Sequence, residues 1–369
     1  MNPVQPKLLM ITGLGSIEDL VSGKKGAFYN TLEEFHKYWE RIDIISPKVR
    51  GQESGVKTYF GNVYVHISSW PLLFHPIWFI KKGMEIYREQ KFDLMTVQEF
   101  PPFYNGIGAR LLWRKIRVPY ILEIHHIVGY PRAANLKEWI YRAMFRLFIK
   151  FDSARAKAIR VVNQNQAVGY LKKCGIPEHK IKYIPSLYID FDIFKPINVQ
   201  KEYDLIFVGR LESNKGIDLF LETVKQLGAK AIIVGNGSLL NKIKLKIENR
   251  KLRIDVRGWA KDQKEIAELI NKSKLLVMPS YNEGGPRVVF ESLACGTPVL
   301  ATPVGLVPDF KSSITTVDWN SKDIATKAKK LLSDKQAYDA IRIQGLSVAK
   351  QFEKKEMIKN YAEKLKTLV

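Results

Sequence analysis

The stretch DLIFVGRLESNKGIDLFLETVKQLGAKAIIVGNG, residues 204–237, decides the fold. Two short apolar runs, DLIFVGR and KAIIVGNG, flank GIDLFLETVKQLG, whose apolar residues recur with the spacing of one helix face. Continuous apolar runs are typical of strands buried on both sides, and an intervening helix joins such strands in parallel. The stretch therefore predicts a strand, a helix and a second, parallel strand.

The same alternation extends in both directions. Further apolar runs predict strands at residues 7–14, 41–47, 63–69, 92–98, 119–126 and 158–164, and again at 254–260, 274–280 and 298–305. Periodicity is lost over residues 188–202. We expect two doubly wound α/β domains, residues 1–188 and 189–351, with residues 352–369 returning as a helix to the first. Because ligands bind beyond the carboxyl ends of the strands in such sheets, an active-site cleft between the domains is predicted.

The composition limits the class of protein. Hydrophobic residues make up 46% of the chain, which excludes disorder as its main state. Two cysteines, Cys174 and Cys295, are too few for a disulfide scaffold and lack the spacing of a zinc site, so we expect free thiols in a reducing compartment. No apolar run reaches the roughly 18 residues that a transmembrane helix needs, and no signal-peptide pattern is found.

Positive charge is concentrated in one region. The chain has 59 Lys and Arg against 37 Asp and Glu, a net charge of +22, and residues 101–160 hold 12 of the basic and 3 of the acidic residues. Such a surface attracts nucleic acid, anionic lipid or phosphorylated substrates. Within it, LKEWIYRAMFRLFIKF (136–151) fits either an interfacial helix on an anionic membrane or a core-packed helix with a solvated basic face.

Two motifs in the second half are suited to binding phosphate. In FVGRLESNKG (207–216), Arg210 and Lys215 lie between a strand end and a helix start, where cations and helix amides together bind a diphosphate. The alternative is a pair of solvated surface cations. In IVGNGSL (233–239), Gly235 and Gly237 would allow a ligand to approach the backbone, but the dinucleotide-binding fingerprint is incomplete and the pair taken alone favours a plain tight turn.

The most specific motif is SYNEGGPRVVFESLACGTPVLATPVG, residues 280–305. Pro286 fits the first position of a helix, and Gly296 fits the position just past its end. Glu283 then stands at the mouth of the helix and Glu291 further along it, on the same side. Taken singly, Glu283 could be a capping carboxylate and Glu291 a structural hydrogen-bond partner.

Glu283 and Glu291, separated by seven residues, resemble the paired-glutamate signature of glycosyltransferase family 4, the glycosyl transferases group 1, which are retaining enzymes of the GT-B fold. VGRLESNKG upstream, PVG downstream and CGIPEHKIKYIPSLYIDFDIFKP (174–196) resemble the same family in order and spacing. The resemblance covers most of residues 160–310. The usual Asn-Gly after Ile-Pro is replaced by Ser186-Leu187.

The resemblance implies a role for each residue of the second half. Arg210 and Lys215 hold the diphosphate and stabilise the leaving group, Glu283 contacts the donor sugar near the transferring carbon, and Glu291 binds the ribose hydroxyls. Further donor contacts are expected from Gly285, Pro286, Arg287 and Val288, and from Gly258 and Trp259 at the base.

In the first half, YILEIHHIVGY (120–130) resembles the strand that carries the family's active-site histidine. His125 is expected as the catalytic histidine and His126 as an acceptor contact, although both could simply pack at a strand end. The glycine-containing loop after the first strand places Gly26 near the diphosphate. Glu99 falls at another strand end and is expected to touch the acceptor.

The function implied by the resemblance is retaining transfer of a hexose-type sugar from a nucleotide sugar to a glycan or lipid-linked acceptor. No metal or other cofactor is expected, since Arg210 and Lys215 take the place of a metal; Asp190 and Asp192 lie in the linker and are interpreted as structural. The setting is cytoplasmic, at the inner face of the membrane. The alternatives are a basic nucleic-acid-binding protein, for which no recognition module is found, and a non-catalytic glycosyltransferase-like scaffold.

Overall fold

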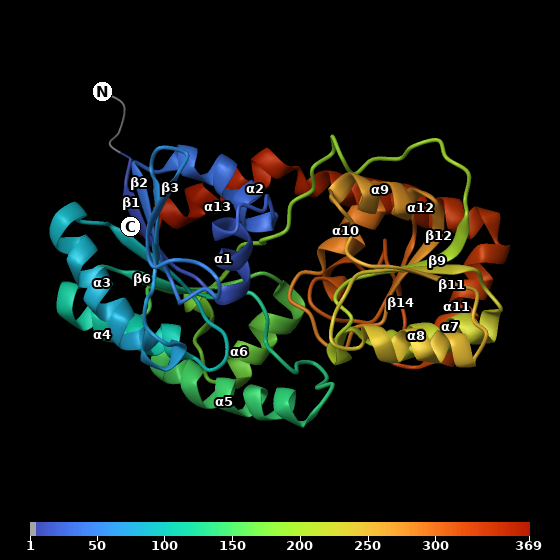
Figure 1. Cartoon of the computed structure of the whole chain (residues 1–369), viewed down its shortest axis with the longest axis horizontal. Helices are drawn as coiled ribbons and strands as arrows, with labels where there is room; N and C mark the ends of the chain where they lie inside the picture. Colours follow the sequence, from blue (N-terminus) through green and yellow to red (C-terminus); the bar gives the residue numbers. More distant parts are fainter. Residues whose placement is uncertain (1–4) are drawn as a thin grey trace. The chain divides into compact units, whose positions relative to one another are not determined.

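The computed structural model describes residues 5–369, with only the backbone described for Leu14 and Ser16. The chain divides into two compact units (Figure 1). The first contains the described residues up to Ile127, then Tyr141–Ser186 and Lys355–Val369. The second contains Val128–Ile140 and Leu187–Lys354. The chain thus crosses between the units more than once.

The first unit is built on an eight-stranded sheet in the order β3-β4-β2-β1-β5-β6-β7-β8. Its strands are β1 (Lys7–Ile11), β2 (Arg41–Ser46), β3 (Gly55–Tyr59), β4 (Val63–Ile67), β5 (Leu94–Gln98), β6 (Tyr120–Ile124), β7 (Ala158–Val161) and β8 (Ile181–Tyr183). The central strands are almost wholly buried, as expected for apolar runs covered on both faces. All pair in parallel except β3, which runs antiparallel to β4 at the edge.

The helices of this unit connect the strands. They are α1 (Leu14–Val21), α2 (Ala27–Phe35), α3 (His75–Gln90), α4 (Tyr104–Ile116), α5 (Leu136–Ser153), α6 (Gly169–Lys173) and, from the far end of the chain, α13 (Lys354–Lys366). Residues Leu136–Ile140 of α5 are assigned to the second unit. Figure 1 shows α13, in red, beside the blue α2. The contact is made by the stacked rings of Phe35 and Tyr361, whose centroids are 4.8 Å apart.

The second unit is built on a parallel sheet in the order β11-β10-β9-β12-β13-β14. Its strands are β9 (Tyr203–Val208), β10 (Ala231–Val234), β11 (Ile254–Arg257), β12 (Ser273–Met278), β13 (Val299–Ala301) and β14 (Thr315–Thr316). Its helices are α7 (Ile217–Leu227), α8 (Leu240–Asn249), α9 (Gln263–Asn271), α10 (Arg287–Ala294), α11 (Ser321–Ser333) and α12 (Lys335–Ala349).

 The last of these, α12 (Lys335–Ala349), leads through one short 3₁₀ turn at Lys350–Phe352 into α13.

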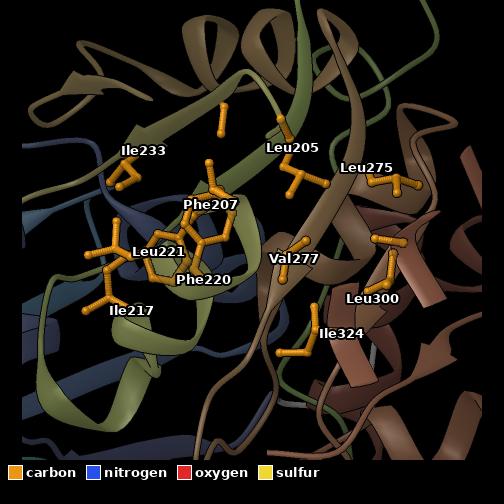
Figure 2. Packing of buried hydrophobic residues seen from close by; sticks show 14 of the residues in the cluster. Leu205, Phe207, Ile217, Phe220, Leu221, Ile233, Leu275, Val277, Leu300 and Ile324 are labelled. Atoms are coloured by element: carbon orange, nitrogen blue, oxygen red, sulfur yellow. The ribbon is translucent and has the colours of Figure 1, made fainter. Parts of the chain in front are cut away.

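The core of the second unit joins the stretch that decided the fold to the rest of its sheet. Phe207 of β9 packs on Phe220 of α7, with ring centroids 5.6 Å apart (Figure 2). Leu275 and Val277 of β12 belong to the same buried cluster. Burying side chains of this size contributes about 1.5–3 kcal/mol each, so the packing fixes where β9 and β12 end.

The expectation of two doubly wound α/β domains is confirmed. Three short strands, β3, β8 and β14, were not predicted, because β3 is largely exposed and the other two have only three and two residues. The glycine-containing loop expected after the first strand is wrong in part, since Leu14–Val21 form α1 there. Among the described residues, no helix is both long and apolar enough to cross a membrane.

Candidate functional site

The loops after β9 and β12 meet at the carboxyl edge of the second sheet. The amide of Tyr281 donates to the carbonyl of Asn214 at 2.8 Å. Gly216 has φ +66°, and a Cβ there would lie 2.0 Å from the carbonyl oxygen of Pro279. Only glycine allows this approach, so the two loops are held together by backbone contacts.

This approach joins two of the predicted site residues. Lys215 Nζ donates to Glu283 Oε1 in a hydrogen-bonded ion pair, and both side chains are mostly buried. Glu283 Oε1 also accepts from Ser280 Oγ at 2.9 Å. The carbonyl of Ser280 in turn accepts from Trp319 Nε1 at 2.9 Å. The carboxylate is therefore fixed in place beside the cation, 68 residues away along the chain.

Helix α10 begins directly after this ion pair. Pro286, predicted as the first helical residue, is instead the N-cap residue, so the helix begins one position later than predicted, and no side chain caps it. The amides of Arg287 and Val288 therefore lie in its first turn, where the helix dipole is positive. Glu291 lies one turn on from Arg287, and burial raises the pKa of its carboxyl although the Arg287 charge opposes the shift. The Arg287 guanidinium itself stacks 4.3 Å from the ring centroid of Tyr188.

The remaining predicted donor residues follow neighbouring strands of the same edge. Arg210 is exposed just after β9 and forms no ion pair with any residue that the structure describes. Gly258 and Trp259 follow β11, and the Trp259 side chain is 64% exposed. Between them, Gly235 after β10 comes so close to Gly209 that a Cβ would lie 1.9 Å from its carbonyl oxygen. The order of the strands thus sets Trp259, Arg210 and Glu283 along one edge.

Residues 128–140 contact this edge, and no local pattern predicted this contact. Asn282 is fully buried, and its Nδ2 donates to the carbonyl of Arg132 at 2.9 Å and to Glu138 Oε2 at 2.8 Å. Asn135 Nδ2 donates to Ser213 Oγ at 3.0 Å. The segment therefore forms hydrogen bonds with Asn282, which directly precedes Glu283, and with Ser213, two residues before Lys215. These hydrogen bonds connect the segment to both loops.

In the first unit, His125 follows β6 at the carboxyl edge of the sheet. Its Nε2 lies 3.5 Å from Glu123 Oε2. Glu123 Oε1 accepts from Arg160 Nη1 and from the hydroxyl of Tyr361, both at 2.7 Å. Burial alone would raise the pKa of Glu123, but the Arg160 charge and the His125 hydrogen bond hold it far below its usual range. A buried, ionised carboxylate thus orients the His125 ring.

Glu123, Arg160 and Tyr361 were not predicted as functional residues. A signal was present for Glu123, because side chains two residues apart on a strand point to the same side, and Glu123 precedes His125 by two. No signal was present for Tyr361, which lies on α13, 238 residues from Glu123.

The other predicted residues of the first unit have different surroundings. Glu99 is buried, and Gly106 lies so close that a Cβ there would be 2.0 Å from Glu99 Oε2. Burial and the charge of Asp152 raise the pKa of Glu99 well above its usual value. Its carboxyl is therefore directed beneath α4 rather than presented at the surface. His126 is half-buried beside His125, and Gly26 is the N-cap residue of α2.

The residues that the structure describes contain no group of three or more His, Cys, Asp or Glu arranged to hold a metal ion. Cys174 and Cys295 are buried, free thiols. In the linker, Asp190 Oδ1 accepts from the amide of Asp192 at 3.1 Å.

The fold is that of the GT-B glycosyltransferases. The Anabaena protein HepE, solved in complex with UDP-glucose, superposes with a TM-score of 0.76 over 98% of this chain and 100% of that chain, at 17% sequence identity. The chain belongs to glycosyltransferase family 4: the model described as Glycosyl transferases group 1 matches residues 189–348, and the model described as Glycosyltransferase Family 4 matches residues 28–187.

Proteins related to this chain in sequence are also named as glycosyltransferases. An uncharacterized glycosyltransferase of Methanocaldococcus jannaschii is 26% identical over 74% of this chain and 74% of its own length. The N,N'-diacetylbacillosaminyl-diphospho-undecaprenol alpha-1,3-N-acetylgalactosaminyltransferase of Campylobacter jejuni is 26% identical over 55% of this chain and 57% of its own length. These matches identify a glycosyltransferase and do not favour the nucleic-acid-binding alternative.

Proposed function

We propose that the chain transfers a sugar from a UDP-sugar to a lipid-linked glycan, with retention of configuration and without a metal ion. The observation that carries the proposal is the Lys215–Glu283 ion pair beside the uncapped start of α10. It combines a cation, helix amides and a carboxylate at one strand edge, which is the chemistry that a sugar diphosphate needs.

Each side chain has a role in this proposal. Lys215 and Arg210 bind the diphosphate, and with the α10 amides they stabilise the negative charge that develops on it as the sugar leaves. When the donor binds, Glu283 keeps part of its contact with Lys215, and its carboxylate also accepts hydrogen bonds from the hydroxyls of the donor sugar. The Glu291 carboxylate accepts hydrogen bonds from the ribose hydroxyls of the nucleotide, and Trp259 lies beside the nucleotide base. Hydrogen bonds to the charged form of Glu291 lower the pKa that burial has raised.

In the first unit, His125 is the proposed catalytic histidine, with its ring oriented by Glu123. His126 is the proposed acceptor contact, and Gly26 at the start of α2 remains a proposed donor contact. For Glu99 the proposal is weakened, since its side chain is buried beneath α4. The expected cleft between the domains remains a prediction.

Donor and acceptor are proposed from the named relatives. HepE is described in complex with UDP-glucose, and the Campylobacter jejuni enzyme is named for a diphospho-undecaprenol acceptor. A polyprenyl diphosphate acceptor places the reaction at a membrane, and the free cysteines fit its cytoplasmic face, where thiols stay reduced.

The donor is tested by thermal unfolding in EDTA with UDP-, GDP- and ADP-sugars. A ligand at 100 times its Kd adds about 2.7 kcal/mol of stability, so only a bound class should raise Tm. Lys215→Ala should abolish the rise, whereas Lys242→Ala, an exposed lysine of α8, should leave it unchanged. No rise with any nucleotide sugar, or a rise that Lys215→Ala does not affect, would overturn the donor site.

Turnover is tested with a polyprenyl-diphosphate sugar acceptor in the same buffer. Product formation in EDTA supports metal-independent chemistry, and the anomeric coupling in the NMR spectrum of the product reports retention or inversion. Binding of a nucleotide sugar without product from any acceptor of a panel would favour the non-catalytic scaffold instead.

A further inference from the structure

The side chain of Tyr361 extends from α13 to Glu123, the carboxylate beside His125, and all three residues belong to the first unit. The Tyr361 ring is buried, stacks on Phe35 and lies 3.8 Å from the guanidinium carbon of Arg160. Burial and the charge of Glu123 raise the pKa of the Tyr361 phenol well above its usual value. The hydroxyl therefore keeps its proton and acts as a hydrogen-bond donor.

The two carboxylate oxygens of Glu123 have different partners. Oε1 accepts from the Tyr361 hydroxyl and from Arg160 Nη1, each at 2.7 Å. A carboxylate oxygen offers about two lone-pair sites, so these two donors fill Oε1. Oε2 is the oxygen that faces His125 Nε2, at 3.5 Å. The two donors thus hold the carboxylate in one orientation, with Oε2 toward the imidazole ring.

This orientation determines which nitrogen of His125 carries the proton. Burial alone would raise the pKa of Glu123, but the Arg160 charge and the His125 hydrogen bond hold it far below its usual range, so the carboxylate is ionised. An ionised carboxylate can only accept, and the nitrogen that faces it must donate. In a neutral imidazole the other nitrogen is then an acceptor, which here is Nδ1. The His125 side chain is 37% exposed, so a ligand can reach the ring.

We propose that Tyr361 is a positioning residue for sugar transfer. It holds the Glu123 carboxylate so that His125 keeps its proton on Nε2 and presents Nδ1 as an acceptor for a sugar hydroxyl. The inference rests on the proposed catalytic role of His125 and adds a residue of α13 to the groups on which that role depends. Tyr361 acts through Glu123 and not on the sugar itself.

The alternative is that Tyr361 only stabilises the packing of α13. The two roles belong to different atoms, because the ring makes the contacts with Phe35 and Arg160 while the hydroxyl makes the hydrogen bond to Glu123. Tyr361→Phe keeps the ring and removes only the hydroxyl. This substitution therefore separates positioning of His125 from packing of the helix.

The first test is steady-state kinetics of the full chain with a UDP-sugar and a polyprenyl-diphosphate sugar acceptor. Tyr361→Phe should lower kcat by about tenfold, the effect of losing one hydrogen bond to a charged group, and should change the donor KM by less than about twofold. The matched control is Tyr120→Phe, which removes another buried hydroxyl of the first unit, bonded to the carbonyl of Asp152 at 2.6 Å. It should leave kcat unchanged.

A double-mutant cycle shows whether Tyr361 acts through His125. In a His125→Ala background, Tyr361→Phe should cause no further loss of kcat, because the ring that it positions is gone. A further tenfold loss in that background would overturn the proposal. So would equal kcat values for Tyr361→Phe and Tyr120→Phe.

The second test does not depend on turnover. The ¹⁵N NMR spectrum of the histidine side chains, recorded above the pH range in which histidine titrates and assigned with His125→Ala, reports which nitrogen is protonated. The wild type and Tyr120→Phe should have the proton on Nε2, and Tyr361→Phe should show a mixture of both tautomers. A proton on Nδ1 in the wild type, or a tautomer that Tyr361→Phe does not change, would refute the positioning role. Absence of product from every acceptor would instead count against the proposed function, and the spectrum would still decide the role of Tyr361.

Discussion

Glu123→Gln provides the most direct test of the polar network beneath His125. The substitution keeps the shape of the side chain and removes its charge, which leaves the buried guanidinium of Arg160 without a counter-ion. Arg160 would retain its hydrogen bonds to the carbonyls of Ile184 and Pro185, at 3.0 and 3.1 Å. Breaking a buried ion pair costs about 3–5 kcal/mol, and these remaining bonds place the expected loss near the lower limit, about 3 kcal/mol.

The loss is measured by urea unfolding and by Tm at pH 7, where it corresponds to a fall of about 6–12 °C. The matched control is Glu178→Gln, which breaks the exposed ion pair with Lys172 in the same unit and should cost less than about 1 kcal/mol. If Glu123→Gln destabilises no more than Glu178→Gln, the assignment of a buried ion pair is refuted.

The pH dependence gives a second readout. Because the folded-state pKa of Glu123 is lowered, its stabilising contribution is present above the pKa of an unfolded glutamate and is lost as the pH falls below it. The difference in stability between wild type and Glu123→Gln should therefore be full at pH 7 and shrink below about pH 4.5. A difference that grows at low pH would contradict the assignment.

Three further predictions concern other parts of the fold. Gly216→Ala should destabilise the second unit by about 3 kcal/mol in urea unfolding, because its φ is +66° and the new Cβ meets Pro279; a loss below about 1 kcal/mol would refute this. Burial raises the pKa of Asp152 to about 7, so the wild type should lose stability as the pH rises from about 4, the pKa of an unfolded aspartate, to about 7, and Asp152→Asn should reduce that loss by about 2 kcal/mol; parallel stability–pH curves would contradict it. Asn282→Ala removes two hydrogen bonds to residues 128–140, so hydrogen exchange there should accelerate while β9 is unaffected; unchanged exchange would show that these bonds do not hold the segment.

The sequence alone determined the strands that are buried and the loops that follow them. Continuous apolar runs such as those of β9 and β10, alternating with helix-like stretches, are typical of strands covered on both faces, so their ends could be located without coordinates. The same pattern could not reveal β3, whose largely exposed residues pair only with β4 at the edge. Local patterning thus predicts the elements that bury apolar surface and misses those held mainly by backbone hydrogen bonds.

The candidate site was predicted as separate residues rather than as an arrangement. Lys215 and Glu283 were each expected from their motifs, but their ion pair depends on the parallel pairing of β9 with β12 and on the close approach at Gly216. The contact of Asn282 with residues 128–140 crosses about 150 residues of chain and has no local signal.

Tertiary structure also decided the surroundings of His125 and the buried face of α5. Tyr361 reaches Glu123 only because α13 packs on the first unit, and a single sequence does not specify which distant side chain meets a buried carboxylate. For α5, the sequence predicted a basic amphipathic helix that fitted either a membrane surface or the core, and only the packing of Phe145 and Ile149 shows which of its apolar residues are buried. The physical reason is the same in each case: spacing along the chain fixes local conformation, whereas the partners of a buried charge or an apolar face are set by which elements pack together.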